Sequence, residues 1–145
     1  MKDKLDEFVD QLQEKIFDEA REVLGEEGFH RWRNIQNRGK MENPTAHGRL
    51  TGTCGDTMEI FLEIENNLVK NASYMTDGCG TSNVSASFAA EMAVGRNVED
   101  LVNITGEAIM ERLGNLPENE IHCPFLAAST IQETLDDYMI KQRKS

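Results

Sequence analysis

The sequence predicts an α+β domain: a small three-stranded antiparallel sheet packed against several helices, with an extra helix at the N-terminus. Two observations favour this class. Apolar residues recur every three or four positions near both ends of the chain, which is typical of amphipathic helices. In between, residues 57–65 alternate apolar and mostly polar side chains, as in a strand with one buried face. Strands followed by helices within 145 residues indicate one α+β unit.

The first element is a helix from Leu5 to Leu24, which Gly25 ends. Its apolar stripe consists of Leu5, Phe8, Val9, Leu12, Ile16, Ala20 and Val23. A short helix is expected over residues 28–33, and residues 34–48 have the Asn, Gly and Pro content of a loop. We therefore divide the chain into a helical extension, residues 1–40, and a domain, residues 41–145. The stripe is expected to pack on the domain, and self-association into a homo-oligomer is the alternative.

Three strands follow, near residues 49–53 and over residues 57–65 and 68–76. Asn66 and Asn67 separate the last two, and both tolerate the left-handed backbone of a tight turn.

The sequence then returns to helical periodicity. Val84, Phe88 and Met92 form one stripe of a helix that Gly95 ends, and short helices are expected over residues 98–102 and 106–113. The last helix begins near Pro124. Its inner stripe is expected to be Ala128, Ile131, Leu135 and Tyr138 or Met139.

Charge and hydropathy exclude several classes of partner. The net charge of −11 disfavours nucleic acid, whose phosphates would be repelled. No apolar run approaches the roughly 20 residues that cross a bilayer. The N-terminal residues are charged and lack the apolar segment that a secretory signal contains. We expect a soluble, cytoplasmic protein without a membrane partner. The acidity could favour a basic protein partner, but solubility alone explains it.

Three cysteines cannot form a complete disulfide set, so metal binding or thiol chemistry is the better use. A lone cysteine is usually a small buried hydrophobe. Here each cysteine is predicted at a boundary that solvent can approach. Cys54 lies in a glycine-flanked turn between strands, whereas Cys79 and Cys123 each precede a helix, whose positive end stabilises thiolate.

Oxygen and nitrogen donors accompany the thiols. Asp56 follows Cys54 by two residues, and His122 adjoins Cys123. Thiolate, imidazole and carboxylate together suit iron or zinc. Alone, Asp56 would more often be a turn residue and His122 an ordinary satisfied histidine. His30 and His47 have no cysteine near them and are not expected to be ligands. The spacing itself is a weak signal, because the chain has no C-x-x-C pair.

Three motifs together resemble the IscU family, which includes the N-terminal domain of NifU. They are Cys54-Gly55-Asp56-Thr57-Met58, Gly78-Cys79-Gly80 before a Ser/Ala-rich helix, and Leu116-Pro117 followed by Ile121-His122-Cys123. They occur in the family's order across roughly residues 43–139. The resemblance implies a three-stranded sheet with helices against it and the three cysteines gathered at one end.

The resemblance further implies a scaffold, not an enzyme, for de novo assembly and transfer of a labile [2Fe-2S] cluster. Cys54, Cys79 and Cys123 would hold the cluster, with Asp56 or His122 as fourth ligand. A cysteine desulfurase would supply sulfur, with Cys123 as the expected acceptor. The cluster would pass to a carrier or to acceptor apoproteins, and Asp56 would keep it exchangeable. Without iron, the same side chains can hold zinc.

Two departures from the family pattern stand out. Where the branch served by a dedicated Hsp70 chaperone has Leu-Pro-Pro-Val-Lys, this chain has Leu116-Pro117-Glu118-Asn119-Glu120, so Hsp70 binding is expected to be weak or absent. Losing that lysine also removes a cation that would favour the Cys123 thiolate. The N-terminal helix is longer and more acidic than the family's usual opening.

Two other functions compete with the scaffold. One is a zinc-holding sulfur acceptor similar to SufU proteins, which carry a mid-domain insertion and lack a histidine before the third cysteine. This chain has His122 and no obvious insertion. The other is a cysteine-nucleophile enzyme using Cys, His and Asp. It is disfavoured because neighbouring side chains such as His122 and Cys123 seldom face each other.

Overall fold

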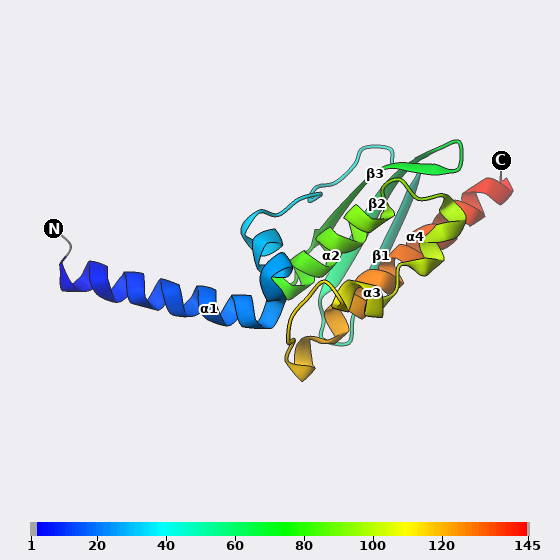
Figure 1. The fold of residues 1–145 in the computed structure, drawn as a ribbon. Helices are drawn as coiled ribbons and strands as arrows, with labels where there is room; N and C mark the ends of the chain where they lie inside the picture. Colours follow the sequence, from blue (N-terminus) through cyan, green and yellow to red (C-terminus); the bar gives the residue numbers. More distant parts are fainter. Residues whose placement is uncertain (1–2, 145) are drawn as a thin grey trace.

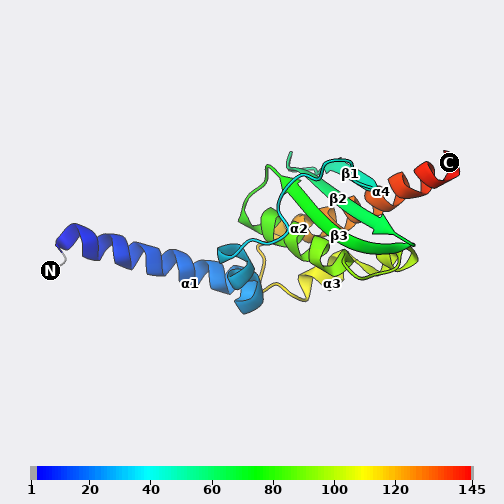
Figure 2. The same cartoon turned by 90° about the horizontal axis from the view of Figure 1, so that it is seen from above.

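A computed structural model describes residues 3–144 as a three-stranded antiparallel sheet with helices packed against one face (Figure 1, Figure 2). The strands are β1 (Ala46–Thr51), β2 (Thr57–Glu65) and β3 (Leu68–Thr76), and they lie in the sheet in that order. The register pairs Ile60 of β2 with Gly48 of β1 and with Tyr74 of β3. The predicted α+β class is therefore confirmed.

The alternating pattern of β2 fixes which face is covered. Met58, Ile60, Leu62 and Ile64 are buried towards the helices, as alternation predicts. Asn66 and Asn67 have φ angles of 54° and 64°, the left-handed values of a two-residue hairpin turn. The predicted bounds of β2 and β3 are confirmed. β1 lies three residues earlier than predicted at its start and two earlier at its end.

Helices α2 (Gly80–Ala93) and α4 (His122–Lys144) cover the sheet, α2 against β3 and α4 mainly against β1. Short 3₁₀ turns η1 (Val98–Asn103) and η2 (Glu118–Glu120) and helix α3 (Gly106–Met110) connect them. α3 ends three residues before the predicted Leu113. The contact between α4 and β1 is close, because a Cβ at Gly48 would lie 2.4 Å from Thr134 Oγ1. On α4, Tyr138 is the buried residue of the predicted pair, whereas Met139 is exposed.

Helix α1 (Lys4–Arg33) consists of two helical parts that meet at Gly25, whose φ of 76° and ψ of 171° are not helical. This confirms the predicted stop and the second short helix. The second part packs on α2, where Arg31 donates to Ser87 Oγ at 3.0 Å and to Glu91 Oε2 at 2.8 Å. Gly25 lies against Gly114, and a Cβ on Gly114 would be 2.5 Å from the Gly25 nitrogen.

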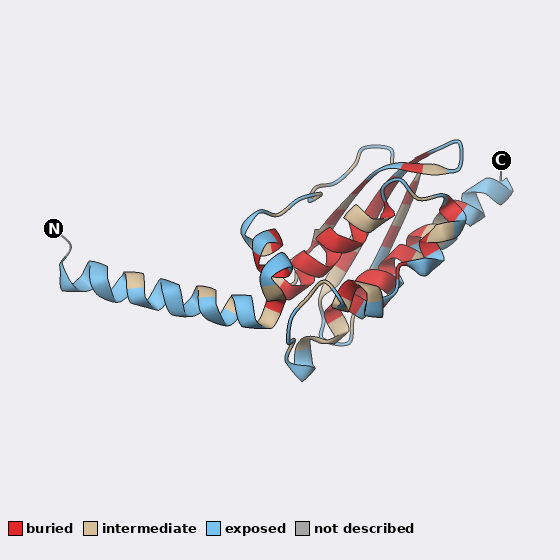
Figure 3. Ribbon diagram, in the orientation of Figure 1, coloured by how far each residue is buried: buried red, intermediate tan, exposed pale blue. Residues whose placement is uncertain are grey.

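The first part of α1 projects away from the body, and the prediction that its stripe packs on the domain is wrong (Figure 3). Leu5 is 68% exposed, Phe8 61% and Leu12 47%. The turn at Gly25 directs the helix outward, so its apolar face meets no part of the sheet or of the other helices over most of its length. Periodicity predicted the face correctly but not what would cover it.

The segment after α1 runs along the outer edge of β3. Tyr74 donates its N–H to Asn37 O at 2.9 Å, and Gly39 donates to Tyr74 O at 2.8 Å. These bonds cover part of a strand edge that would otherwise be unpaired. The domain boundary predicted at residue 40 stays a prediction. Within residues 3–144, none of the helices has an apolar stretch that would cross a lipid bilayer.

Candidate functional site

Cys54 is presented by a tight loop between β1 and β2. Gly52 donates to Asp56 O at 2.8 Å, and Gly55 donates back to Gly52 O at 3.0 Å. Gly55 has a φ of 92°, which residues with a side chain rarely adopt. The loop leaves the Cys54 thiol exposed and turns the half-buried Asp56 towards α2.

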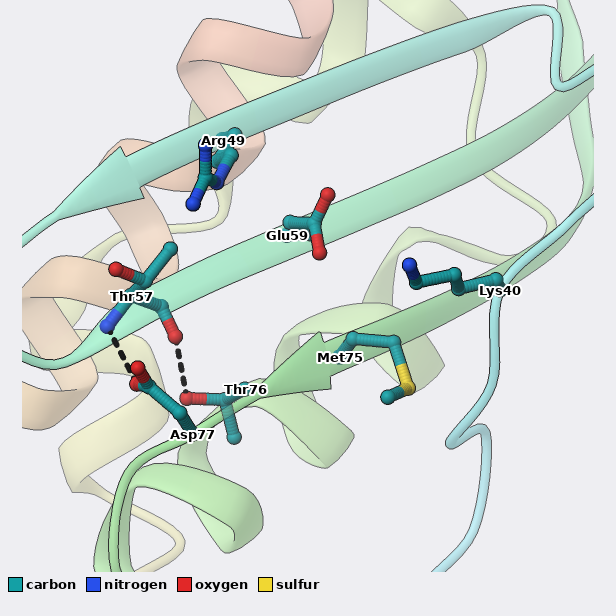
Figure 4. Close-up of a pocket in the computed structure, with 7 residues that line it drawn as sticks. All are labelled: Lys40, Arg49, Thr57, Glu59, Met75, Thr76 and Asp77. Atoms are coloured by element: carbon teal, nitrogen blue, oxygen red, sulfur yellow. Dashed lines mark hydrogen bonds between the residues drawn. The ribbon is translucent and has the colours of Figure 1, made fainter.

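A brace between β2 and β3 holds this loop beside the one that carries Cys79. Thr57 donates its N–H to Asp77 Oδ1 at 2.7 Å, and Thr76 Oγ1 donates to Thr57 O at 2.7 Å (Figure 4). Gly78 donates in turn to Thr76 Oγ1 at 3.1 Å. The brace therefore fixes the positions of Asp56 and Cys79, which lie next to it in the sequence.

Thr57, Thr76 and Asp77 also line a shallow hollow of about 260 Å³, together with Lys40, Arg49, Glu59 and Met75. The hollow contains none of the five predicted site residues, so it is not part of the site.

The site forms where α4 begins, beside the Cys54 loop and the first turn of α2. His122 Nε2 lies 2.7 Å from Cys54 Sγ and 3.7 Å from Cys123 Sγ. Ligand atoms of Cys54, Asp56 and His122 all lie within 4.8 Å of one another. Four of the five predicted residues are thus in one group, although they come from separate parts of the chain.

Ser82 joins the two sides of this group. Its hydroxyl donates to Asp56 Oδ2 at 3.0 Å and lies 3.4 Å from Cys123 Sγ. No role for Ser82 was predicted from the sequence. Its place three residues after Cys79, on the first turn of a helix, is the signal that could have identified it, since residues so spaced share a helix face.

Cys79 lies at the rim of the group. Its thiol is exposed and is 3.9 Å from Glu120 Oε1, which also accepts a hydrogen bond from Thr81 at 2.9 Å. Cys79 is still close enough to Cys123 for its charge to raise the pKa of that thiol. Sequence reasoning treated Glu120 only as a departure from the family and missed its contact with Cys79.

Cys123 differs from the expectation that solvent approaches every cysteine, because it is only 1% exposed. Burial raises the pKa of its thiol to about 11, and the neighbouring Cys79, Cys54 and Asp56 charges add to the rise. The contact with Ser82 lowers the pKa by less. The predicted stabilisation of its thiolate by the helix start is therefore wrong in this conformation: desolvation outweighs it.

Thiol labelling should show this difference. At neutral pH, limiting iodoacetamide is expected to alkylate Cys54 and Cys79 well before Cys123, because the reagent reaches the first two and reacts with thiolate. Labelling of Cys123 should rise as the pH climbs towards its pKa of about 11. Mass spectrometry of proteolytic peptides gives the order, and denatured protein, in which the three should react alike, is the control. Equally fast labelling of native Cys123 at neutral pH would contradict its burial.

The remaining histidines lie outside the site, as expected. The His47 ring stacks on Phe61 at 4.6 Å, and its Nε2 lies 3.1 Å from Glu59. His30 is exposed and lies 3.8 Å from Glu26.

The donor set of the site suits a metal or a metal cluster. Thiolates with one imidazole and one carboxylate form the mixed sulfur, nitrogen and oxygen environment that iron and zinc accept. Because two of the thiols are exposed and two non-thiolate donors lie near Cys54, ligands can exchange at this position. The geometry therefore favours temporary binding over a permanently buried centre.

The chain is similar to known proteins along most of its length. The model of the NifU-like N-terminal domain family matches residues 25–145. An iron–sulfur cluster assembly scaffold protein named IscU, from Archaeoglobus fulgidus, is 34% identical over 117 residues, which cover 80% of this chain and 76% of that protein.

Solved structures share the fold. The N-terminal NifU-like protein of Brucella abortus superposes with a TM-score of 0.65 at 14% identity, covering 83% of this chain and 97% of that one. A Fervidobacterium islandicum protein, described as a cluster assembly scaffold for the SUF system, gives a TM-score of 0.62 at 14% identity, with 80% and 98% covered. At such identities the structures support the fold alone.

Proposed function

The chain belongs to the family of NifU-like N-terminal domains, and we propose that it is a scaffold on which iron–sulfur clusters are assembled, not an enzyme. The observation that carries this proposal is the grouping of Cys54, Asp56, His122 and Cys123, with Cys79 at the rim. The relative from Archaeoglobus fulgidus, which is named as a cluster assembly scaffold, supports it.

The cargo we propose is a labile [2Fe-2S] cluster held by the three thiolates and one further donor. Asp56 and His122 both lie close to Cys54, so they compete for the fourth place. A carboxylate binds iron less firmly than thiolate does, which favours release. In the absence of iron, the same donors would hold zinc tetrahedrally.

A cysteine desulfurase is the proposed sulfur source. The sequence favoured Cys123 as acceptor, but that thiol must first become exposed. Cys54 and Cys79 are exposed and need no such change. Because the Cys54 thiol is already in contact with His122 at 2.7 Å, we propose Cys79 as the point of entry. Its thiolate would attack the terminal sulfur of the desulfurase persulfide. A new S–S bond forms on Cys79, the desulfurase cysteine leaves as thiolate, and no net oxidation occurs.

Delivery would run to a carrier or directly to acceptor apoproteins. Glu118 and Glu120 stand where the chaperone-served branch has proline and lysine, so we propose that transfer does not depend on Hsp70. A cytoplasmic location is likewise proposed.

The groups around His122 do not favour a cysteine-nucleophile enzyme. His122 faces two cysteines, since its Nε2 lies 2.7 Å from Cys54 Sγ and 3.7 Å from Cys123 Sγ. A catalytic triad would need a third group that orients the imidazole. Asp56 accepts a hydrogen bond from Ser82, and within residues 3–144 the His122 ring bonds only to the two thiols, so no carboxylate orients the imidazole. The zinc-holding sulfur acceptor stays the second candidate, because the same donors serve it.

One experiment tests the proposal. The protein is purified without oxygen and incubated with ferrous iron, cysteine and a cysteine desulfurase, and its visible spectrum and metal content are recorded. A scaffold should develop thiolate-to-iron charge-transfer bands and then lose its iron to an apoferredoxin. Zinc that iron cannot replace would favour the second candidate. A protein that gains neither bands nor bound metal would refute both.

A further inference from the structure

The projecting part of α1, residues 4–24, leaves a continuous apolar stripe in water. Leu5, Phe8, Val9, Leu12 and Ile16 are each between 47% and 68% exposed, and their spacing places them on one face. An apolar surface of this kind on an otherwise polar helix marks an interaction site. The family model begins at residue 25, so this segment lies outside the matched domain.

The stripe leads to the cluster site. A groove of about 320 Å³ continues from the stripe and is lined by Ile16, Glu19, Ala20, Val23, Leu24 and Trp32 of α1. Cys79, Gly80, Thr81 and Glu120 line the same groove. The open face of the helix and the exposed thiol of Cys79 therefore belong to one connected surface.

Contacts at the base of the helix hold this surface in place. Phe17 packs edge to face on Phe29, with ring centroids 5.9 Å apart, and on Trp32 at 6.2 Å. Asn115 donates its N–H to Glu22 O at 3.2 Å. The helix thus stands in a defined direction from the groove, although its stripe is uncovered.

Charge decides which partner fits the stripe. Residues 3–24 contain eight acidic and three basic side chains, and the whole chain has a net charge of −11. Two copies paired through this helix would bring like charges together, which opposes association. A helix with Lys or Arg beside an apolar stripe would satisfy both the apolar face and its acidic flanks.

We propose that residues 4–24 and the groove at Cys79 form one docking surface for a basic amphipathic helix of a partner protein. The docked helix brings one of its ends to the Cys79 thiol. The second statement rests on the proposed scaffold function, in which Cys79 exchanges sulfur with a partner; the binding itself does not.

The first test measures binding to the full-length, metal-free protein. The probe is a synthetic helical peptide with Leu on one stripe and Lys on both flanks, compared with a scrambled peptide of the same composition. Leu12→Glu is expected to weaken binding about tenfold or more, because it removes a Leu side chain that the docked peptide would bury. Gln11→Glu adds the same charge at the flank of the stripe, outside the apolar contact, and should not weaken binding, because a carboxylate there would face the Lys residues of the peptide. Added salt should weaken the wild-type complex.

The second test asks where the ends of the peptide lie. Two versions of the peptide are made, each with a single cysteine activated as a pyridyl disulfide. One version has this cysteine at its N-terminus and the other at its C-terminus. A Cys79 thiolate that attacks this disulfide forms a mixed disulfide and releases pyridine thione. One version should label Cys79 at least about tenfold faster than the scrambled peptide does, since docking raises the local concentration. Leu12→Glu should remove that advantage.

Several results would overturn the inference. Equal binding of the ordered and scrambled peptides would refute the docking surface, and equal labelling by both versions and the scrambled peptide would refute the approach to Cys79. A concentration-dependent dimer that Leu12→Glu abolishes, without peptide binding, would assign the stripe to a second copy of the chain. Because binding is measured without metal, a failure to assemble a cluster would count against the proposed function alone. Leu12→Glu should still accept a cluster built with inorganic sulfide.

Discussion

Replacing Cys54 by Ala will abolish the charge-transfer bands of the reconstituted protein, whereas replacing Asp56 by Ala will lengthen the life of its cluster. The Cys54 thiol lies 2.7 Å from His122 and within 4.8 Å of an Asp56 carboxylate oxygen. Without this thiol, only the weaker imidazole and carboxylate ligands stay on that side of the site. Cys79→Ala and Cys123→Ala should have the same effect, because a thiolate is the ligand that iron–sulfur clusters require.

Asp56→Ala acts through the fourth ligand. With the carboxylate gone, His122 can occupy that position without competition, and nitrogen should hold iron more firmly than an exchangeable carboxylate. We expect the half-life of the cluster to rise about threefold to tenfold, which corresponds to ~1 kcal/mol in the barrier to loss. Ser82 loses its acceptor in this variant but keeps its contact with Cys123 at 3.4 Å.

The measurement is the decay of visible absorbance after a chelator is added, together with iron content. Asp136→Ala, which removes an exposed carboxylate from α4, is the matched control and should decay as the parent does. If Asp56→Ala loses its cluster faster than the parent, Asp56 stabilises the cluster and its proposed role in exchange is wrong.

The largest loss of stability is expected from Gly48→Ala. An added Cβ would lie 2.4 Å from Thr134 Oγ1 and 2.6 Å from the Thr134 nitrogen, so it meets the backbone of α4 as well as a side chain. Thr134 is fully buried, and its hydroxyl donates to Thr130 O at 2.7 Å. Since neither β1 nor α4 can yield locally, the free energy of unfolding should fall by about 2 to 3 kcal/mol.

Urea denaturation followed by circular dichroism will measure this change. Gly52→Ala is the control, because its nearest neighbour is the end of the flexible Leu126 side chain at 3.2 Å. We expect that variant to lose less than about 1 kcal/mol. Similar losses in both variants would show that the contact between α4 and β1 adjusts more easily than its packing indicates.

The sequence predicts most of the sheet and the residues of the site because both depend on local patterns. Alternation along residues 57–65 and the Asn66-Asn67 turn determine β2, β3 and their hairpin register. The glycines around Cys54 and Cys79 indicate tight loops before any contact is known. Gly25 is found where the helical periodicity is interrupted.

Other features depend on contacts that no local pattern encodes. His122 lies closest to Cys54, 68 residues earlier in the chain, at 2.7 Å, and farther from its neighbour Cys123, at 3.7 Å. Cys123 is buried beside Ser82 of α2, and this burial reverses the expected effect of the helix start on its pKa. The stripe of α1 is apolar by sequence, but its exposure follows from the backbone angles at Gly25.

The meeting of Gly25 and Gly114 has a consequence for how this chain can diverge. Main-chain atoms touch there, and a Cβ on Gly114 would also lie 2.7 Å from Glu22 O. The joint between the projecting helix and the body is therefore set by close backbone contact at the two glycines, together with the aromatic contacts of Phe17 with Phe29 and Trp32. Outer residues of the helix can change without altering its direction. Substitutions in this outer part can therefore change the binding specificity proposed for the helix, while the core that carries the cysteines stays intact.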